Sequence, residues 1–192
     1  MNLFYCFLIT LLSISSHDDR NIRLQEEYAA ARSRINSVIS ENGMENEISG
    51  SEYLVFMTGG ISNMLIIISC DSQFKIYRYF NKEMSVVSYE SKKNLPEIVS
   101  LFKFADSQET PLIYNVLDKD AEYNPFYYYM GIFDESNRPM LELNLHSMKA
   151  FKKTIKPRKL RKIYPITPEQ GSCIDSLFMG YYIDVYMNKT AN

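Results

Sequence analysis

Apolar residues recur along residues 18–42 at the spacing of one helix face. The apolar stripe consists of Leu24, Tyr28, Ala31, Ile35 and Val38. The opposite, polar face consists of Arg23, Glu26, Arg32 and Arg34. Intervals of three and four residues predict an amphipathic helix. Ser16 or Asp18 can cap its start, and Asn42-Gly43 suits the left-handed conformation that ends many helices. We expect the charged face to be solvated.

The next stretch alternates between short apolar runs and short polar links. Residues 44–52 are polar and predict a loop. Four runs follow that are typical of strands, at 53–58, 64–69, 73–80 and 83–90. The links at 70–72 and 81–82 are short enough for hairpins, which indicates antiparallel pairing.

A short helix and a second group of strands come next. Asn94 can cap a helix that opens at Pro96. Its apolar stripe consists of Ile98, Leu101, Phe102 and Ala105. The second group of runs lies at 112–117, 126–133 and 140–146, with 134–137 as the turn of a hairpin. The last run alternates leucines with Glu142, Asn144 and His146, so we expect one solvated face.

The C-terminal region begins with a capping signature. Thr167-Pro168-Glu169-Gln170 matches a capping box with proline at the first helical position. The pattern predicts a helix to about residue 178 and fits either a helix or a strand over 179–188. Strands in hairpin-linked runs between three helices predict an α+β fold with a largely antiparallel sheet. Length favours one domain, over residues 17–192.

The N-terminus carries an apolar run of about a dozen residues, 3–14. This is shorter than the ~20 residues of a membrane-spanning helix but fits the central region of a signal peptide. Ser13 and Ser15 can occupy the small positions before a cut near residue 16. We therefore expect a secreted or periplasmic protein with no transmembrane span in the mature chain. The alternative is a cytoplasmic protein whose residues 3–14 are buried core.

A cut near residue 16 leaves Cys70 and Cys173 of the three cysteines. An oxidising compartment permits one disulfide between them. Because Cys70 ends a core strand and Cys173 begins the last helix, which has to pack on the sheet, we predict Cα atoms within the ~7 Å that a disulfide can span. The alternative is two buried free thiols.

Candidate chemistry for catalysis is sparse. Ser172 or Cys173 with His146 and Asp175 can be drawn as a hydrolase site, but no Gly-x-Ser-x-Gly motif surrounds the serine. A carboxylate pair is a second route to hydrolysis. Acids at residues 118–122 lack the glycine and distal glutamate of a calcium loop. We expect no metal site and no cofactor.

Charge is distributed unevenly along the chain. The net charge is −2, which gives no whole-protein argument for nucleic-acid binding. Residues 149–162 nevertheless hold 8 of the 21 basic residues and no acid, leaving 13 bases against 23 acids elsewhere. The basic segment is a candidate for contact with an anionic surface or an acidic protein, and a solvated edge is the alternative. The candidate binding residues are Lys152, Lys153, Lys156, Arg158, Lys159, Arg161 and Lys162. Pro157 argues against a continuous helix here.

Tyrosines supply the second candidate surface. Strand alternation places Tyr127 and Tyr129 on the face opposite Phe126 and Tyr128. That face is either an open surface for a ligand or is packed under a helix. The sequence therefore favours a non-enzymatic exported binding domain. A small hydrolase and an inhibitor or immunity-type interaction protein are the alternatives.

Overall fold

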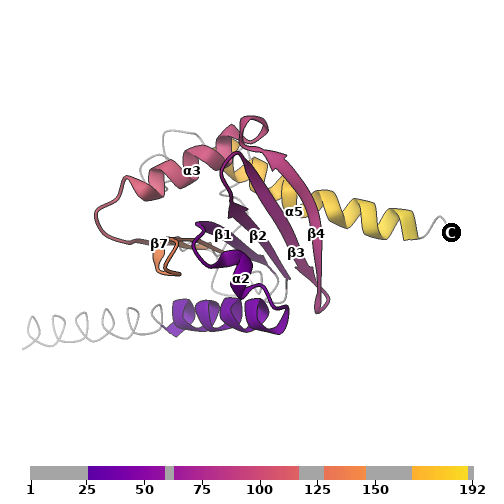
Figure 1. The fold of residues 1–192 in the computed structure, drawn as a ribbon, viewed down its shortest axis with the longest axis horizontal. Coiled ribbons are helices and arrows are strands. Elements are labelled where there is room, and N and C mark those ends of the chain that lie inside the picture. Colours follow the sequence, from indigo (N-terminus) through magenta and orange to yellow (C-terminus); the bar gives the residue numbers. More distant parts are fainter. Residues whose placement is uncertain (1–25, 59–62, 117–127, 146–165, 190–192) are drawn as a thin grey trace, which may run out of the picture.

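The computed structural model describes residues 26–58, 63–116, 128–145 and 166–189. Seven strands in this part of the chain form one sheet, in the order β4-β3-β2-β1-β6-β7-β5. The strands are β1 (Tyr53–Thr58), β2 (Asn63–Ser69), β3 (Gln73–Phe80), β4 (Glu83–Ser91), β5 (Leu112–Val116), β6 (Tyr128–Phe133) and β7 (Pro139–Leu145). The helices are the N-terminal helix (residues 26–41), α2 (Glu45–Ile48), α3 (Pro96–Asp106) and α5 (Pro168–Lys189), with a 3-10 turn at Lys92–Asn94. The predicted α+β class is confirmed (Figure 1).

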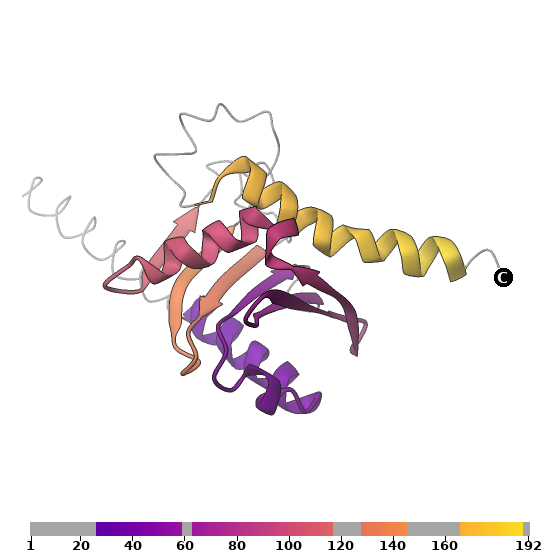
Figure 2. The same cartoon turned by 45° about the horizontal axis from the view of Figure 1, so that its top comes forward.

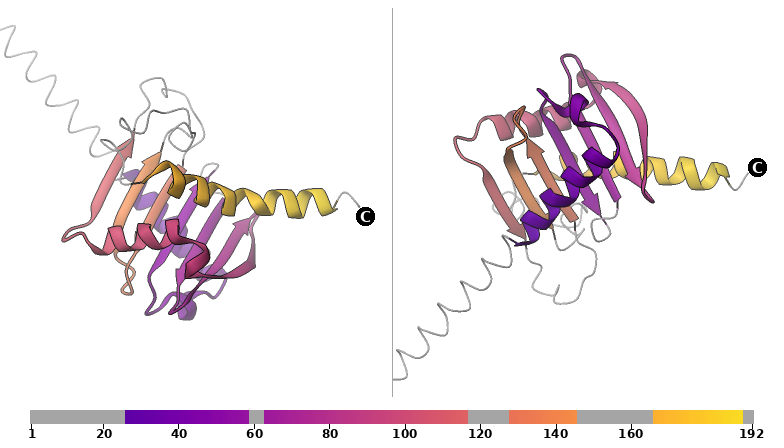
Figure 3. Two further views of the ribbon diagram at one scale, coloured as in Figure 1. Left: turned by 90° about the horizontal axis from the view of Figure 1, so that it is seen from above. Right: turned by 60° about the horizontal axis from the view of Figure 1, so that its bottom comes forward.

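Neighbouring strands pair antiparallel, except that β5 and β7 run parallel. The antiparallel prediction is confirmed for the rest of the sheet. The parallel pair arises because β5 follows α3, which leads the chain from β4 at one edge to the far edge (Figure 3). No tight turn therefore fixes the direction of β5.

Alternation along the strands divides the core between the two faces of the sheet. In β1, Tyr53, Val55 and Met57 lie on one face, here called face A, and Leu54 and Phe56 lie on the other, face B. All five are buried. Because helices cover both faces, every side chain of the central strands is directed into a core, and their sequences are continuous apolar runs.

The N-terminal helix and α2 cover face A (Figures 1 and 2). The described part of the predicted stripe, from Tyr28 to Val38, is buried. Gly43 adopts φ 64°, and the Met44 amide donates to the carbonyl of Ile39 at 3.0 Å, so the predicted glycine stop is confirmed. The loop predicted for 44–52 instead contains α2, because Ile48 finds a buried site on this face.

Helices α3 and α5 cover face B. The predicted stripe of α3 is buried, but Asn94 does not cap it. Asn94 lies in a 3-10 turn that starts at Ser91, whose hydroxyl accepts from the Lys93 amide, so the cap prediction is wrong. The capping box of α5 is confirmed: the Gln170 amide donates to Thr167 Oγ1 at 3.3 Å, and the Thr167 amide donates to Gln170 Oε1 at 2.8 Å.

Candidate functional site

Most of the predicted surface residues lie outside the residues that the structure describes. This applies to the basic segment 149–162, to Tyr127, to His146 and to the acidic stretch 118–122. Of the predicted hydrolase residues, Ser172 is exposed on α5, while Cys173 and Asp175 are half-buried on the same helix. The predicted Ser/His arrangement depends on His146 and therefore lies outside the described residues.

The tyrosines of face A are packed under helices rather than open. Tyr77, Tyr79 and Tyr129 are all buried. The Tyr77 hydroxyl donates to Glu47 on α2, and Arg34 of the N-terminal helix donates to the Tyr79 hydroxyl at 3.0 Å. Burial and the neighbouring Glu47 carboxylate raise the pKa of Tyr77. Tyr129 therefore does not contribute to an open surface, and the alternative of packing under a helix holds for it.

A buried polar network links the N-terminal helix to β7. Glu142 is fully buried on face A, and its carboxylate accepts from Arg32 Nε at 2.8 Å and from the Tyr129 hydroxyl at 2.7 Å. A second Arg32 nitrogen reaches the other carboxylate oxygen, so the pair is bidentate. Hydrogen bonding to Glu142 raises the pKa of Arg32. The expectation of a solvated face is wrong for Glu142, because the N-terminal helix crosses this end of the sheet. Arg32 stays partly solvated while it reaches the buried carboxylate.

Gly131 makes room for this network. It lies between Tyr129 and Phe133 on β6, beside Glu142 on β7. A Cβ atom at residue 131 would meet the Tyr129 hydroxyl oxygen at 2.5 Å and the Phe133 ring at 2.7 Å. Only glycine therefore allows both rings to fold over the strand. The network has a structural role, since it joins a helix to a strand inside the core.

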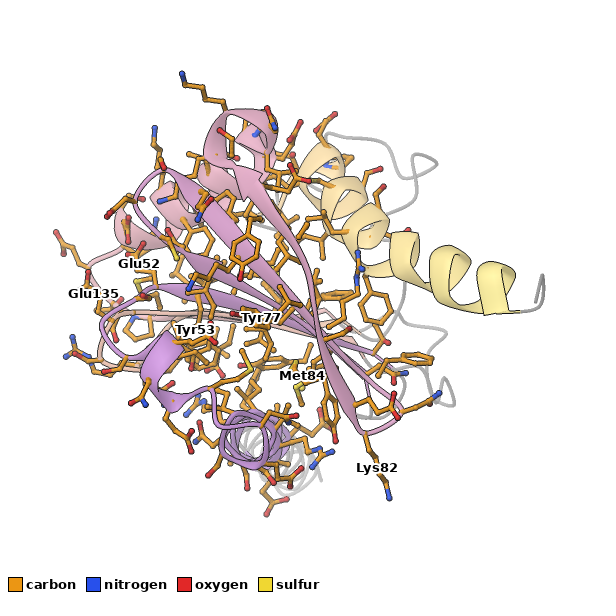
Figure 4. The ribbon with its side chains drawn as sticks, turned by 45° about the vertical axis from the view of Figure 1, so that its right-hand side comes forward. Glu52, Tyr53, Tyr77, Lys82, Met84 and Glu135 are labelled. Atoms are coloured by element: carbon orange, nitrogen blue, oxygen red, sulfur yellow. The ribbon has the colours of Figure 1, made fainter. Side chains whose placement is uncertain are left out.

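Acidic side chains lie close together at the end of the β1–β6 pair where Tyr53 pairs with Phe133, away from Tyr129. Figure 4 shows Glu52 near Glu135, and Lys82 far from both at the tip of the β3–β4 hairpin. Burial, then a hydrogen bond with Asp106, raises the pKa of Glu52 to about 7. The neighbouring Tyr53 hydroxyl donates to Asn137 in the β6–β7 turn. A carboxyl group that titrates near neutral pH can act as a general acid or base.

Strand β4 forms an edge of the sheet and carries apolar side chains that helices leave uncovered. Val86 is 50% exposed and Tyr89 is 58% exposed. They pair in register with Tyr77 and Lys75, and paired residues share a face, so both lie on face A. The register shifts between Ile76 and Tyr77, which is a bulge on the edge strand. A bulge of this kind discourages the edge from pairing with another strand.

Helix α5 has two unlike halves. The body half, residues 168–178, lies on face B, where Phe178 packs edge-on against Phe56 with ring centroids 5.7 Å apart. Arg78 on β3 donates from Nε to the carbonyl oxygen of Leu177 at 2.8 Å. Since β3 neighbours the edge strand β4, the residues that follow Leu177 pass this edge. The projecting half, residues 179–189, stands clear of the sheet in Figures 1, 2 and 3.

The sequence of α5 changes character where the helix leaves the sheet. In the body half the outward stripe is polar, with Glu169, Ser172 and Ser176 exposed. The positions that continue this stripe at helical spacing are Met179, Ile183 and Met187. The projecting half also contains Tyr181, Tyr182, Val185 and Tyr186, with Asp184 and Lys189 as its charged residues. A helix that is apolar around most of its circumference requires burial.

The two cysteines are free and do not form the predicted disulfide. Cys70 packs against the face A cluster and Cys173 against the face B cluster, so the sheet separates them. The prediction of neighbouring Cα atoms is therefore wrong. Burial raises the pKa of the Cys173 thiol, which makes it a poor nucleophile.

Comparison of the chain with protein families, with curated proteins and with solved structures finds no match. No helix in the described part of the chain combines the length and apolar character that a membrane span needs. The same residues contain no group of three or more His, Cys, Asp or Glu side chains placed to hold a metal ion.

Proposed function

We propose that the chain is a non-enzymatic protein-binding domain that contacts its partner through the β4 side of the sheet. The observation that carries this proposal is the projecting half of α5, whose apolar sequence extends past the edge of the sheet. An apolar helix surface left in water is unfavourable by about 25 cal/mol per Å². A protein partner removes that cost.

The exposed apolar residues of β4 support the same conclusion. Val86 and Tyr89 lie at the edge that α5 passes, so two separate elements carry apolar residues along one edge of the sheet, on its opposite faces. Large exposed apolar areas on soluble proteins commonly mark interaction sites. A membrane surface is a poorer fit, since Lys189 is the one basic residue of the projecting half and interfacial helices depend on several.

Site-specific photo-crosslinking in the native host tests this function. A photoreactive residue placed at Ile183 should form a covalent adduct with another polypeptide. The matched position is Ser172, which is exposed on the body half of the same helix, and it should give no adduct. Absence of an adduct at Ile183, or equal adducts at both positions, would contradict the proposal.

The proposed partner contact takes place outside the cytoplasm, in keeping with a signal peptide over residues 1–16. The support is the short apolar run followed by small residues. Intact-mass analysis of the protein from its native host should give a chain that lacks about 16 residues. Recovery of a chain that still begins at Met1 would contradict export by cleavage.

A small hydrolase is the second candidate function, and Glu52 is the observation that favours it. Its pKa of about 7, beside Asp106, is the arrangement that a general acid uses. A panel of aryl glycosides and aryl esters tests this candidate against Glu52→Gln. Turnover that disappears in the variant supports a hydrolase, and turnover that is absent or unchanged rejects Glu52 as its acid.

A further inference from the structure

Two apolar parts of the chain lie at the same edge of the sheet but on opposite faces. Val86 and Tyr89 of β4 lie on face A. The projecting half of α5 continues a helix that is packed on face B. Because the sheet separates them, neither part can cover the other within one chain.

A two-fold axis along the β4 edge brings these parts together between two chains. Rotation by 180° about an axis in the plane of the sheet reverses its faces. Face A of one copy then lies on the same side as face B of the other. We infer that the partner is a second copy of this chain, in which each projecting half of α5 lies over Val86 and Tyr89 of the other copy.

This inference rests on the proposed function and names its partner. A two-fold contact is self-complementary, because each copy supplies both the helix and the strand that receives it. Rotation about the β4 edge leaves the two edge strands parallel, so no antiparallel ladder between them is needed. The bulge at Val86–Ser88 is consistent with this, since it interrupts the regular edge that such a ladder uses.

The area available matches that of a stable dimer. The 11 residues of the projecting half extend about 16 Å at about 1.5 Å per residue. Each of its three tyrosines can bury about 150–250 Å². With its four aliphatic and methionine side chains, the side-chain surface of one projecting half amounts to roughly 1,000 Å², of which a contact on one side covers roughly 500 Å². The strand surface beneath it loses a similar area, so two reciprocal contacts bury roughly 2,000 Å² in total, at the upper end of the ~1,200–2,000 Å² of specific interfaces. A one-way contact with an unrelated protein buries roughly half of that.

Light scattering after size exclusion of the full chain tests the second copy directly. The wild type, produced with residues 1–16 retained, should elute with twice the chain mass of 22.4 kDa. Ile183→Lys in the helix and Val86→Lys on the strand should each raise the dissociation constant about thirtyfold or more, as expected for the centre of an interface. Thermal melting of each variant, followed by circular dichroism, should show that the fold is kept.

Mixing the two variants tests the reciprocal exchange. A mixed dimer contains one intact contact, between the helix of the Val86→Lys copy and the strand of the Ile183→Lys copy. It should therefore form at a concentration where each variant alone is monomeric. Ser172→Lys on the body half, Ile113→Ser on the far edge β5, and Leu8→Ser in the N-terminal apolar run are the matched controls, and all should remain dimeric.

Each remaining outcome overturns the inference in a different way. A monomeric wild type at 100 µM rejects the second copy, and crosslinking at Ile183 then still decides whether another protein binds there. A dimer that is lost with Ile183→Lys but not with Val86→Lys rejects the crossing onto β4. A dimer that survives both variants, or that is lost with Leu8→Ser, rejects this surface as the interface.

Discussion

Replacement of Arg32 by methionine tests how the N-terminal helix is held on the sheet. Glu142 is fully buried, whereas 39% of the Arg32 side chain is exposed. Loss of one partner from a fully buried ion pair costs about 3–5 kcal/mol, because the other charge remains without compensation. The partial exposure of Arg32 lowers this value, and we expect Arg32→Met to cost about 2–3 kcal/mol at pH 7. Methionine keeps most of the packing of the aliphatic stem.

Urea unfolding at pH 7 provides the assay. Addition of Glu142→Gln should recover part of the loss at pH 7, since the amide can still accept from Tyr129. The matched control is Arg138→Met, which removes an ion pair whose arginine side chain is 77% exposed and should cost less than about 0.5 kcal/mol. Equal costs for the two arginine variants would refute this account of the network.

Glu52, Gly131, the two cysteines of the folded domain and the basic segment each give one further prediction. Because burial raises the pKa of Glu52 to about 7, the folded state binds a proton that the unfolded state releases above about pH 4.5. The free energy of unfolding should therefore fall as the pH rises from about 4.5 through 7. Glu52→Gln should reduce this fall by about 1 kcal/mol, after allowance for solvent screening, when urea unfolding is compared at pH 5 and pH 8. The same pH dependence in the wild type and the variant would contradict the raised pKa of Glu52. Gly131→Ala should lower the free energy of unfolding by about 1–3 kcal/mol through overpacking, and unchanged chemical denaturation would contradict the crowding. Because Cys70 and Cys173 lie on opposite faces, a reducing agent should leave the Tm of a Cys6→Ser variant unchanged, whereas a fall would indicate a bridge. Residues 149–162 should retain the protein on heparin at low salt and release it at physiological salt, and flow-through at low salt would reject polyanion binding.

The hairpins and helices were largely predictable because their signals are local. Asn81 and Lys82 adopt φ values of 52° and 68°, which is the two-residue turn expected between closely spaced strands. Thr167 and Gln170 form their capping box from residues three positions apart.

The buried network was missed because it depends on which helix crosses which strand. Alternation correctly separates Glu142 from the leucines of β7, but it cannot show that the N-terminal helix covers that face. A signal was present in the sequence. Arg32 immediately follows Ala31 of the apolar stripe, and a single carboxylate lies between Leu141 and Leu143. Predicting that these two residues, 110 positions apart, are in contact requires the tertiary fold.

The end of α5 could not be assigned from its pattern, since residues 179–188 lack a clear helical or strand period. The structure continues the helix through Gly180, which a helix interior tolerates at a cost of about 1 kcal/mol. The positions of Cys70 and Cys173 were also beyond sequence reasoning, because the order of the strands decides which face receives each element.

Amide hydrogen exchange along α5 tests the central claim, that the projecting half is covered by protein. The last turns of an uncovered helix fray and exchange quickly, whatever the body half does. We predict that residues 180–189 of the wild type are protected nearly as well as residues 172–178, and that Ile183→Lys abolishes the protection of residues 180–189 alone. Fast exchange of residues 180–189 in the wild type from the native host would contradict the account.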